Sequence, residues 1–542
     1  IGGFRELYHL LVAHREALLD VDGPLERFAE DEVRVLIRPT RTYDQLLFES
    51  FHPDTLHDAL DRDLLFDRLW LVLPGRPHMA PVITAEQEDL QRGDIPVFTT
   101  RPASLELERG SGEIISGFLT ETGISLARAR IKQLGDQDLQ RQEWFIRSSL
   151  ATLSPYEFGI SEPLKPSYRL AESAPKIGRE KLLKCAHAVA DRLVETAVLG
   201  EEDVCWLGLD MLPGASWDIS PVGMNLYSGV PGIALFLAYA GAILEEERYT
   251  DLARRGLNGM LRHIERFGDD LPGIGGFDGW GGTLYTLTNL GILWDDTAVL
   301  AQAEDVVDIL ANFIEEDDLF DVMRGAAGAI AALLSFHHCQ PSTRALDAAT
   351  ACGDHLLASA QILEQGLGWA PPDSNSPPLT GFAHGAAGIA WALLSLAEAT
   401  GEERYRVAAQ QAVAYERSLF TPEVGNWPDL RSGDLGNGQA ASGLPRDHVA
   451  WCHGAAGIGF SRLSAFQISP SEALYDEIQT ALNTTIDRGF GQSHCLCHGD
   501  MGNLELLLEA SRVFDEEKWR LEAQRLGSRI IESLDPHGCY CG

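Results

Sequence analysis

A Gly-x-x-Gly string followed directly by a strongly apolar segment occurs six times from about residue 220 onward in this chain of 542 residues. Successive copies are separated by 50, 46, 60, 69 and 45 residues. The strings begin at Gly229, Gly279, Gly325, Gly385, Gly454 and Gly499. Self-similarity at intervals of some tens of residues is typical of an array of equivalent supersecondary units. The repeat therefore constrains the fold more strongly than any other feature of the chain.

The segments between these strings are more polar and show a single apolar stripe. They cover about 177–198, 244–266, 296–315, 343–364, 402–419, 471–489 and 515–534. A helix that is apolar all round is buried, whereas one with a single stripe covers the outside of a core. Alternating inner and outer helices predict a mainly α fold, an α/α toroid of six to seven helical hairpins. Because seven outer helices accompany six inner ones, we expect a seventh inner helix beyond Gly542 and a chain cut at both ends.

The first 165 residues read as a mixed α/β segment. A β-prone run from Arg34 to Thr40 ends in a turn, and helical patterns follow over about 43–51, 60–69 and 126–150. Residues 155–175 are proline-rich and non-periodic, as expected of a boundary. The sequence thus predicts two domains, 1–165 and 166–542.

Charge and cysteine usage exclude several classes of protein. The chain has 43 Lys and Arg against 80 Asp and Glu, a formal charge of −37, which argues against nucleic-acid binding. No uninterrupted apolar run reaches about 18 residues, so no membrane span is expected. The nine cysteines do not have the spacing of a secreted disulfide scaffold, and we therefore expect a cytoplasmic protein.

Two of the glycine strings follow cysteine and histidine. Cys452 precedes the fifth string, and Cys497 and His498 precede the sixth. Thiolate and imidazole are ligands that Zn²⁺ prefers, and three protein ligands with one open position are typical of a catalytic zinc site. The alternative is a pair of buried cysteines with a capping histidine, but the occurrence of two such strings favours the metal. The neighbouring His453, His494 and Cys495 are interpreted as flanking residues; additional ligands or partners of the ligands are the alternative.

The motifs, taken as a set, resemble those of the class II (LanM-type) lanthipeptide synthetases. The cyclase-like strings lie at 225–238, 383–388, 451–454 and 497–503, and the dehydratase-like strings at 34–43, 51–53, 93–96 and 138–142. The resemblance covers essentially the whole chain. It implies the C-terminal part of a dehydratase domain followed by a LanC-like cyclase whose last inner helix is missing.

The resemblance also implies a chemistry. The dehydratase phosphorylates Ser and Thr of a ribosomal precursor peptide with ATP and Mg²⁺ and eliminates phosphate, and Arg34 and Thr40 match positions used in elimination. The zinc-dependent cyclase adds peptide Cys thiols to the resulting double bonds, forming lanthionine and methyllanthionine. Cys452, Cys497 and His498 match its zinc ligands, and His384 its acid/base residue. A downstream transporter or protease is a further expected partner.

One position departs from the family. The family often has Asp where this chain has Asn225, so the proton-transfer partner stays open, with Asp278 as a candidate. A non-catalytic or glutathione-handling LanC-like module is the alternative function. A carbohydrate-active toroid would need paired carboxylates at the inner-helix starts. Those starts instead have Asn225, Asp278, Arg324, His384, Cys452 and His498.

We predict that this chain alone does not phosphorylate a peptide. It contains neither a Gly-x-x-x-x-Gly-Lys-Ser/Thr loop nor a His-Arg-Asp catalytic loop, so the ATP site of the kinase-like dehydratase is not expected within it. Incubation of residues 1–542 with labelled ATP, Mg²⁺ and a precursor peptide should leave the peptide unlabelled. Transfer above a heat-inactivated control would contradict this prediction.

Overall fold

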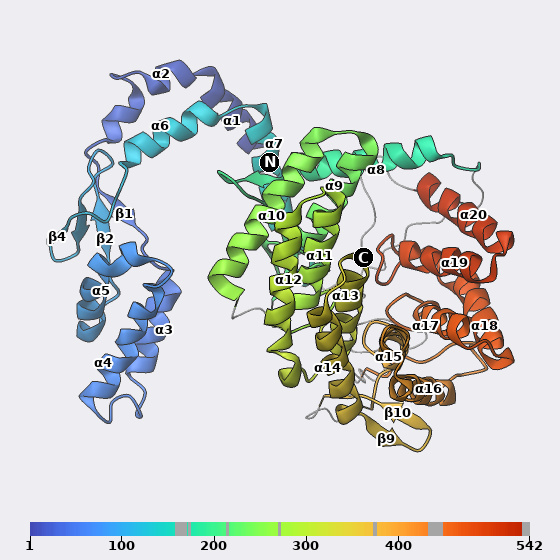
Figure 1. Ribbon diagram of the computed structural model, residues 1–542. Helices are drawn as coiled ribbons and strands as arrows, with labels where there is room; N and C mark the ends of the chain where they lie inside the picture. Colours follow the sequence, from blue (N-terminus) through green and yellow to red (C-terminus); the bar gives the residue numbers. More distant parts are fainter. Residues whose placement is uncertain are drawn as a thin grey trace. The chain divides into compact units, whose positions relative to one another are not determined.

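The computed structural model describes residues 1–157, 171, 175–212, 216–268, 273–371, 377–431 and 448–533. Their contacts divide the chain into two compact units, Ile1–Ala151 and Thr152–Gly542 (Figure 1). The boundary predicted at residues 165 and 166 lies outside the described residues. The two units are therefore described separately.

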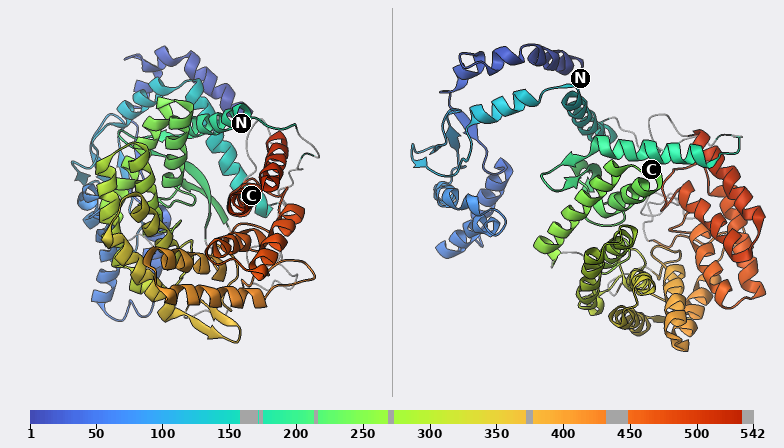
Figure 2. Two further views of the ribbon diagram at one scale, coloured as in Figure 1. Left: turned by 45° about the vertical axis from the view of Figure 1, so that its right-hand side comes forward. Right: turned by 45° about the horizontal axis from the view of Figure 1, so that its top comes forward.

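The second unit consists of alternating inner and outer helices. The inner helices are α9 (Val230–Leu244), α11 (Trp280–Leu293), α13 (Ala326–Cys339), α15 (Ala386–Thr400), α17 (Ala455–Ile468) and α19 (Asp500–Phe514). The outer helices are α8 (Arg179–Thr196), α10 (Glu247–Phe267), α12 (Thr297–Ala311), α14 (Thr343–Ser359), α16 (Glu403–Ser418), α18 (Glu472–Arg488) and α20 (Glu517–Ser533). The helix pairs follow one another in an arc, from green α9–α12 to red α19 and α20 (Figures 1 and 2). The predicted α/α toroid is confirmed.

Burial follows the apolar pattern of each helix. Inner helix α15 buries residues on all sides, whereas outer helix α10 buries one stripe that includes Tyr249, Leu257 and Met260. The ring closes where α8 and the segment before it meet α20. The backbone N–H of Ile177, before α8, donates to Ser528 Oγ (3.2 Å), and Lys181 on α8 pairs with Glu532 (2.9 Å). Among the described residues, none of the helices has the length and hydropathy of a membrane span.

The second glycine of each string allows an inner helix to start against the loop that precedes it. A Cβ atom at Gly388 would lie 2.0 Å from the carbonyl oxygen of Phe382, and one at Gly457 would lie 1.9 Å from that of Trp451. The other four strings repeat this contact, each with the carbonyl six residues earlier. Only a residue without a side chain permits such an approach.

The loops before the inner helices are joined by backbone hydrogen bonds into what we name the mouth ring. The bonds run from Leu226 N to Phe277 O (2.9 Å), Phe277 N to Met323 O (3.1 Å), Met323 N to Ala383 O (3.3 Å), Ala383 N to Cys452 O (3.2 Å) and Cys452 N to Cys497 O (3.0 Å). Each loop therefore sets the position of the next one around the ring.

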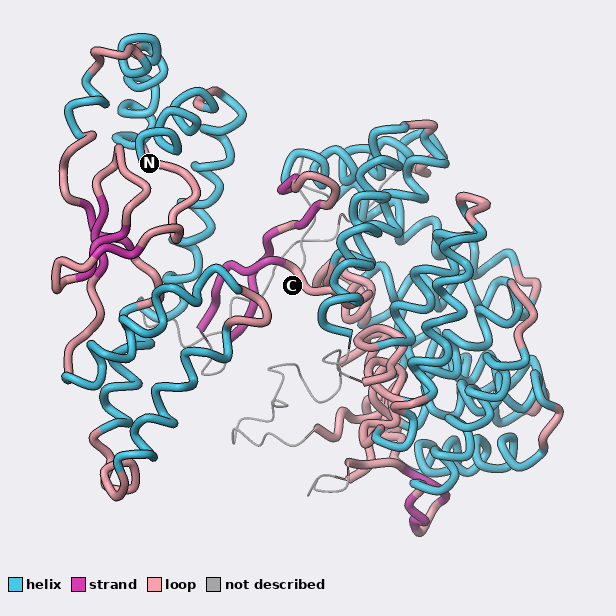
Figure 3. The backbone as a smooth tube through the Cα atoms, turned by 60° about the vertical axis from the view of Figure 1, so that its left-hand side comes forward, coloured by secondary structure: helices cyan, strands magenta, loops and turns pink. Residues whose placement is uncertain are grey.

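The second unit also contains short hairpins that the sequence pattern did not predict (Figure 3). They pair β5 (Val198–Leu199) with β6 (Val204–Cys205), β7 (Leu207–Leu212) with β8 (Ser216–Pro221), and β9 (Gln361–Leu363) with β10 (Gly366–Gly368). All are antiparallel. Strands this short leave little periodicity in the sequence.

The first unit is mixed α/β, as expected. Its sheet has the antiparallel order β1 (Val33–Val35), β2 (Phe98–Thr100), β3 (Leu107–Arg109) and β4 (Ile114–Ile115). Its helices are α1 (Gly2–Ala13), α2 (Arg15–Leu19), α3 (Thr40–Ser50), α4 (Ala59–Asp67), α5 (Ala80–Arg92), α6 (Gly123–Gln133) and the part of α7 (Asp136–Glu157) that precedes Thr152.

The prediction of one continuous helix over 126–150 is wrong. Helix α6 ends at Gln133, and α7 begins at Asp136. The hydroxyl of Tyr8 accepts a hydrogen bond from Gly135 N (3.0 Å) and donates to Asp138 Oδ2 (2.5 Å). The backbone N–H of Gly135, at the break between the two helices, thus bonds a residue 127 positions away in the chain. Local periodicity cannot reveal such a distant partner.

We predict that Gly388→Ala destabilises the second unit by about 2–3 kcal/mol, the cost of overpacking a close contact. Gly527→Ala on α20 is the matched control, because its Cβ would meet only Leu504 Cδ1 at 3.7 Å. Replacing this helical glycine should stabilise the unit by about 0.5–1 kcal/mol. Urea unfolding followed by circular dichroism measures both changes, and equal unfolding midpoints for the two variants would refute the close-contact explanation.

Candidate metal centre

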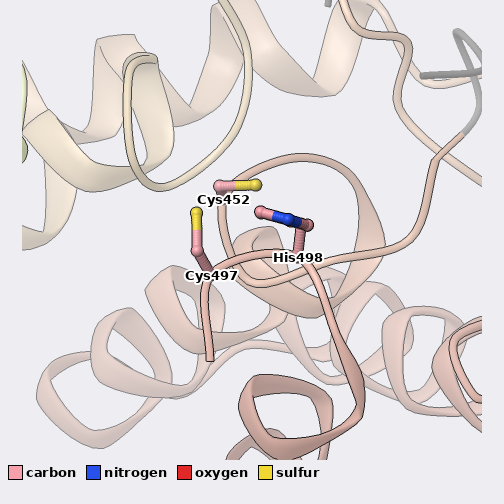
Figure 4. A group of neighbouring side chains, drawn as sticks. All are labelled: Cys452, Cys497 and His498. Carbon is pink, nitrogen blue, oxygen red and sulfur yellow. The ribbon is translucent and has the colours of Figure 1, made fainter. Parts of the chain in front are cut away.

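The structure brings Cys452, Cys497 and His498 together at the mouth ring. Their candidate ligand atoms all lie within 4.8 Å of one another (Figure 4). Cys452 is buried on the loop before α17, and the other two residues are partly buried on the loop before α19. Two thiols and one imidazole within this distance form a donor set that suits Zn²⁺.

Side-chain hydrogen bonds hold these two loops in register. Asn426 Oδ1 accepts from Ala455 N (2.8 Å) at the start of α17. Asn503 Nδ2, on the first turn of α19, donates to the carbonyls of Val449 (3.1 Å) and Gly489 (2.6 Å). Both asparagines are fully buried, so these bonds are shielded from competing water. The bond between Cys452 N and Cys497 O completes the link between the ligand loops.

The electrostatics of the cluster favour a thiolate beside an imidazolium. The hydrogen bond from Cys452 and the contact with His498 hold the pKa of Cys497 at about 4. The same bond to Cys497, together with burial, raises the pKa of Cys452. Contacts with Cys495 and then Cys497 raise the pKa of His498 to about 10. A divalent cation would replace these protons as the partner of the sulfur atoms, so the residues fit a metal ion.

Cys495 is more than a flanking residue. It contacts His498, and its Sγ lies 3.2 Å from Ser493 Oγ. Burial acts to raise the pKa of Cys495, but the bonds with His498 and Ser493 outweigh it and lower the pKa. Groups that bond a metal-ligating histidine orient its ring. Cys495 therefore lies where it can orient His498.

His384 has a carboxylate partner that was not among the residues predicted from the sequence. Its Nδ1 lies 2.7 Å from Oδ2 of Asp321, whose side chain is only 9% exposed. Asp321 is in turn oriented by Arg324 N, which donates to its Oδ1 (2.6 Å). The His384 ring also stacks on His453, with centroids 5.8 Å apart. Asp321 lies four residues before the third glycine string, and this position was the one sequence feature that could have indicated a role at the mouth ring.

Asn225 and Asp278, the two candidates for the proton-transfer partner, do not contact His384 and instead bond other groups. Asn225 Oδ1 accepts a hydrogen bond from Ser228 N (2.8 Å), which stabilises the loop before α9. Asp278 pairs with Arg324 (3.4 Å) rather than with His384. Asp278 is therefore ruled out as the partner of His384 in this structure.

A buried ion pair supports the loop of His384 from behind. Glu416 on α16 and Arg462 on α17 are both 0% exposed, and Arg462 Nη2 lies 3.0 Å from Glu416 Oε2. The other oxygen of Glu416 accepts from Gly381 N (2.8 Å). Gly381 has φ +97°, and a Cβ there would lie 2.7 Å from Cys452 O. The pair thus fixes the point where this loop crosses the Cys452 loop.

Two further polar side chains have bonds that the sequence did not predict. Burial, and then the hydrogen bond with Cys497, raises the pKa of Tyr227. Arg431 is held by Asp429, with its Nε 3.0 Å from each carboxylate oxygen. Tyr227 lies within the motif at residues 225–238, although the sequence did not predict a role for it. Arg431 lies outside every repeat, so no sequence signal marked it.

Arg34 and Thr40 lie in the first unit. Arg34 is an exposed residue of β1, and Thr40 is the exposed first residue of α3. Two other residues of the same motif point inward, because Arg38 (2.8 Å) and Tyr43 (2.6 Å) both bond Oε1 of the fully buried Glu86. The inward pair therefore stabilises the unit, while Arg34 and Thr40 remain accessible.

Comparison with known proteins gives two family matches. Residues 220–542 match the model described as "Lanthionine synthetase C-like protein", and residues 1–101 match a domain of unknown function, DUF4135. The lacticin 481/lactococcin biosynthesis protein LcnDR2 of Lactococcus lactis subsp. lactis is 22% identical over 559 residues, which cover 97% of this chain and 54% of the relative. The chain thus spans about half the length of this curated relative.

Among solved structures, nisin cyclase is similar, with a TM-score of 0.50 and 16% sequence identity over 66% of this chain and 89% of its own. This likeness supports the α/α toroid. The first family match covers more than half of the chain, and the two matches occur in the order that the motifs predict. The chain belongs to the lanthionine synthetase C-like family, in the two-part arrangement of the LanM-type synthetases.

Proposed function

We propose that the second unit is a zinc-dependent peptide cyclase that forms lanthionine and methyllanthionine. The observation that carries the proposal is the Cys452–Cys497–His498 cluster on the same mouth ring as the His384–Asp321 pair. The substrate is a precursor peptide that contains cysteine together with dehydroalanine or dehydrobutyrine. Family membership and the toroid support this assignment.

Cys452, Cys497 and His498 would hold the zinc ion. Three protein ligands leave one position for a further ligand. Zinc, when bound, supplies a Lewis acid that deprotonates a coordinated thiol, whose pKa is otherwise near 8.5. Cys495 and Tyr227 contact His498 and Cys497, and they orient these ligands.

His384 moves the proton of the addition. Its Nδ1 faces Asp321, which fixes the tautomer with the proton on Nδ1 when the ring is neutral and stabilises the imidazolium when it is charged. Nε2 is then the atom that exchanges a proton with the substrate. As the peptide thiolate forms a bond to Cβ of the dehydroamino acid, His384 delivers a proton to Cα.

The first unit is proposed to be part of a dehydratase, with a domain boundary near residue 165. Arg34 suits a phosphate leaving group because guanidinium binds phosphate bidentately. Thr40 is the first residue of α3, and the N-terminus of a helix favours a nearby anion. ATP and Mg²⁺ would serve this reaction in a longer protein.

A LanC-like module that only binds peptide or glutathione is the second candidate. The His384–Asp321 pair favours catalysis, because a binding site for a thiol has no need of an oriented proton donor. The two candidates differ in an observable way: a binding module would protect peptide thiols without forming a thioether.

We predict about one zinc ion per chain of purified protein, as in other sites of this donor set. Cys497→Ala should remove most of the zinc, because two remaining ligands bind it weakly. Cys339→Ala, which changes an exposed cysteine at the end of α13, is the control and should retain zinc. Metal analysis by mass spectrometry measures the content. Absence of zinc from the unaltered chain grown with zinc would refute the metal centre.

We predict that His384→Gln and Asp321→Asn slow thioether formation while zinc content stays unchanged. The loss should be about 10²–10⁴-fold for His384→Gln, the usual contribution of general acid–base catalysis. The assay counts free thiols of a dehydrated precursor peptide over time and identifies the thioether by mass spectrometry. A variant with unaltered rate would show that the proton comes from another group.

A further inference from the structure

Two aromatic side chains meet across the inside of the mouth ring. Phe277 lies on the loop before α11 and Trp451 on the loop before α17, so the loops before α13 and α15 separate them around the ring. Their ring centroids nevertheless lie 5.6 Å apart, with the ring planes at 70°. Edge-to-face contacts of this kind are favourable for aromatic pairs. The two side chains therefore span the ring instead of following it.

The two intervening loops contribute side chains to the same apolar group. Phe382, on the loop before α15, has its ring centroid 5.3 Å from that of Trp451. Met323, on the loop before α13, is 7% exposed and belongs to a small apolar cluster against which Phe277 and Trp451 pack. We name Phe277, Met323, Phe382 and Trp451 the apolar floor. Because four loops that bond one another supply these side chains, the floor has little room to move.

The apolar floor adjoins both parts of the candidate site. The cluster that contains Met323 also contains Ala383 and Cys452, and Cys497 packs against it from the edge. Cys452 and Cys497 belong to the proposed metal centre, and Ala383 directly precedes His384 in the chain. The floor therefore extends from the metal cluster to the loop of the acid/base residue.

The proposed reaction requires its substrate to lie over this floor. The sulfur atom that joins Cβ of the dehydroamino acid comes from the side of the metal cluster, and the proton that joins Cα comes from His384. Since Cα and Cβ are neighbouring atoms, the dehydroamino acid lies between these two groups. The apolar cluster is what the protein provides between them. A substituent on Cβ then meets the floor.

We infer that Phe277 and Trp451 are specificity-determining residues that contact Cβ of the dehydroamino acid and discriminate dehydroalanine from dehydrobutyrine. This inference rests on the proposed cyclase function and names the part of the substrate that the site distinguishes. Dehydrobutyrine has a methyl group on Cβ where dehydroalanine has hydrogen. One methyl group in an apolar site changes relative rates by about 10–200-fold. Because the floor is fixed, the unaltered chain disfavours the additional methyl group.

The test compares Phe277→Leu with the unaltered chain of residues 1–542. Two peptides of one sequence are used, each with a single cysteine and either dehydroalanine or dehydrobutyrine. We expect the ratio of kcat/KM for dehydrobutyrine to that for dehydroalanine to rise about 10-fold, because the smaller side chain makes room for the methyl group. The lower intrinsic reactivity of the substituted double bond is the same for both chains and cancels in this comparison. Zinc content should stay unchanged.

Phe514→Leu is the matched control. Phe514 is the last residue of α19, at the end of that helix away from the mouth ring, and its ring centroid lies 5.4 Å from that of Phe466 and 5.6 Å from that of Tyr475. The same exchange there should leave the ratio unchanged. Trp451→Phe is a second variant of the floor, and its ratio should rise as well. It decides the question if thermal unfolding shows that the Phe277→Leu chain is not folded.

The outcomes separate this inference from the proposed function. If the unaltered chain accelerates thioether formation with neither peptide, the cyclase proposal fails and the specificity role fails with it. If that chain is active but the ratio changes less than threefold in the folded floor variant, or falls, the inference alone is overturned. Equal loss of both rates, or loss of zinc from the floor variant, would indicate a structural role and also overturn the inference.

Discussion

The close approach between each inner helix and the loop before it is the contact on which the second unit depends. At Gly388 and Gly457 the space for a side chain is taken by a backbone carbonyl, so glycine is the only residue that permits the helix to start there. The same carbonyl-bearing loops form the mouth ring through their other backbone groups. The repeated string therefore positions six loops at one end of the toroid, and the side chains of the candidate site lie on these loops.

The two histidines of the mouth ring, His384 and His498, have different bonding partners. His498 is bonded to Cys495 and Cys497, whereas His384 is bonded to Asp321. Behind the ring, Glu416 neutralises Arg462 and simultaneously anchors Gly381. Removing one member of such a buried pair leaves an uncompensated charge, which typically costs about 3–5 kcal/mol. Arg462 also pairs with Glu477 (2.6 Å), so it is the loss of Arg462 that would leave the fully buried Glu416 without a counter-charge.

The toroid and the grouping of Cys452, Cys497 and His498 could be predicted from the sequence because both are properties of the repeat. Helical periodicity marks the inner and outer layers, and the ligand types occur at two equivalent positions, before Gly454 and Gly499. Asp321 could not be predicted in the same way, since its role arises from a partner 63 residues away. The break between α6 and α7 was missed for a similar reason, because Tyr8 lies far from it in sequence.

Thiol addition requires a thiolate and a protonated acid at the same time. If the two groups were in direct contact, the acid would protonate the thiolate. The fold separates these requirements by loop. In the proposed cyclase, the Cys452 and Cys497 loops would provide sulfur and imidazole ligands. The preceding loop holds His384 against Asp321, and the two regions touch through the bond from Ala383 N to Cys452 O. On the proposed function, acid and nucleophile would then be held within reach of one substrate while each keeps its own partner, because Asp321, the partner of His384, lies on a fourth loop, before α13, rather than beside the proposed metal ligands.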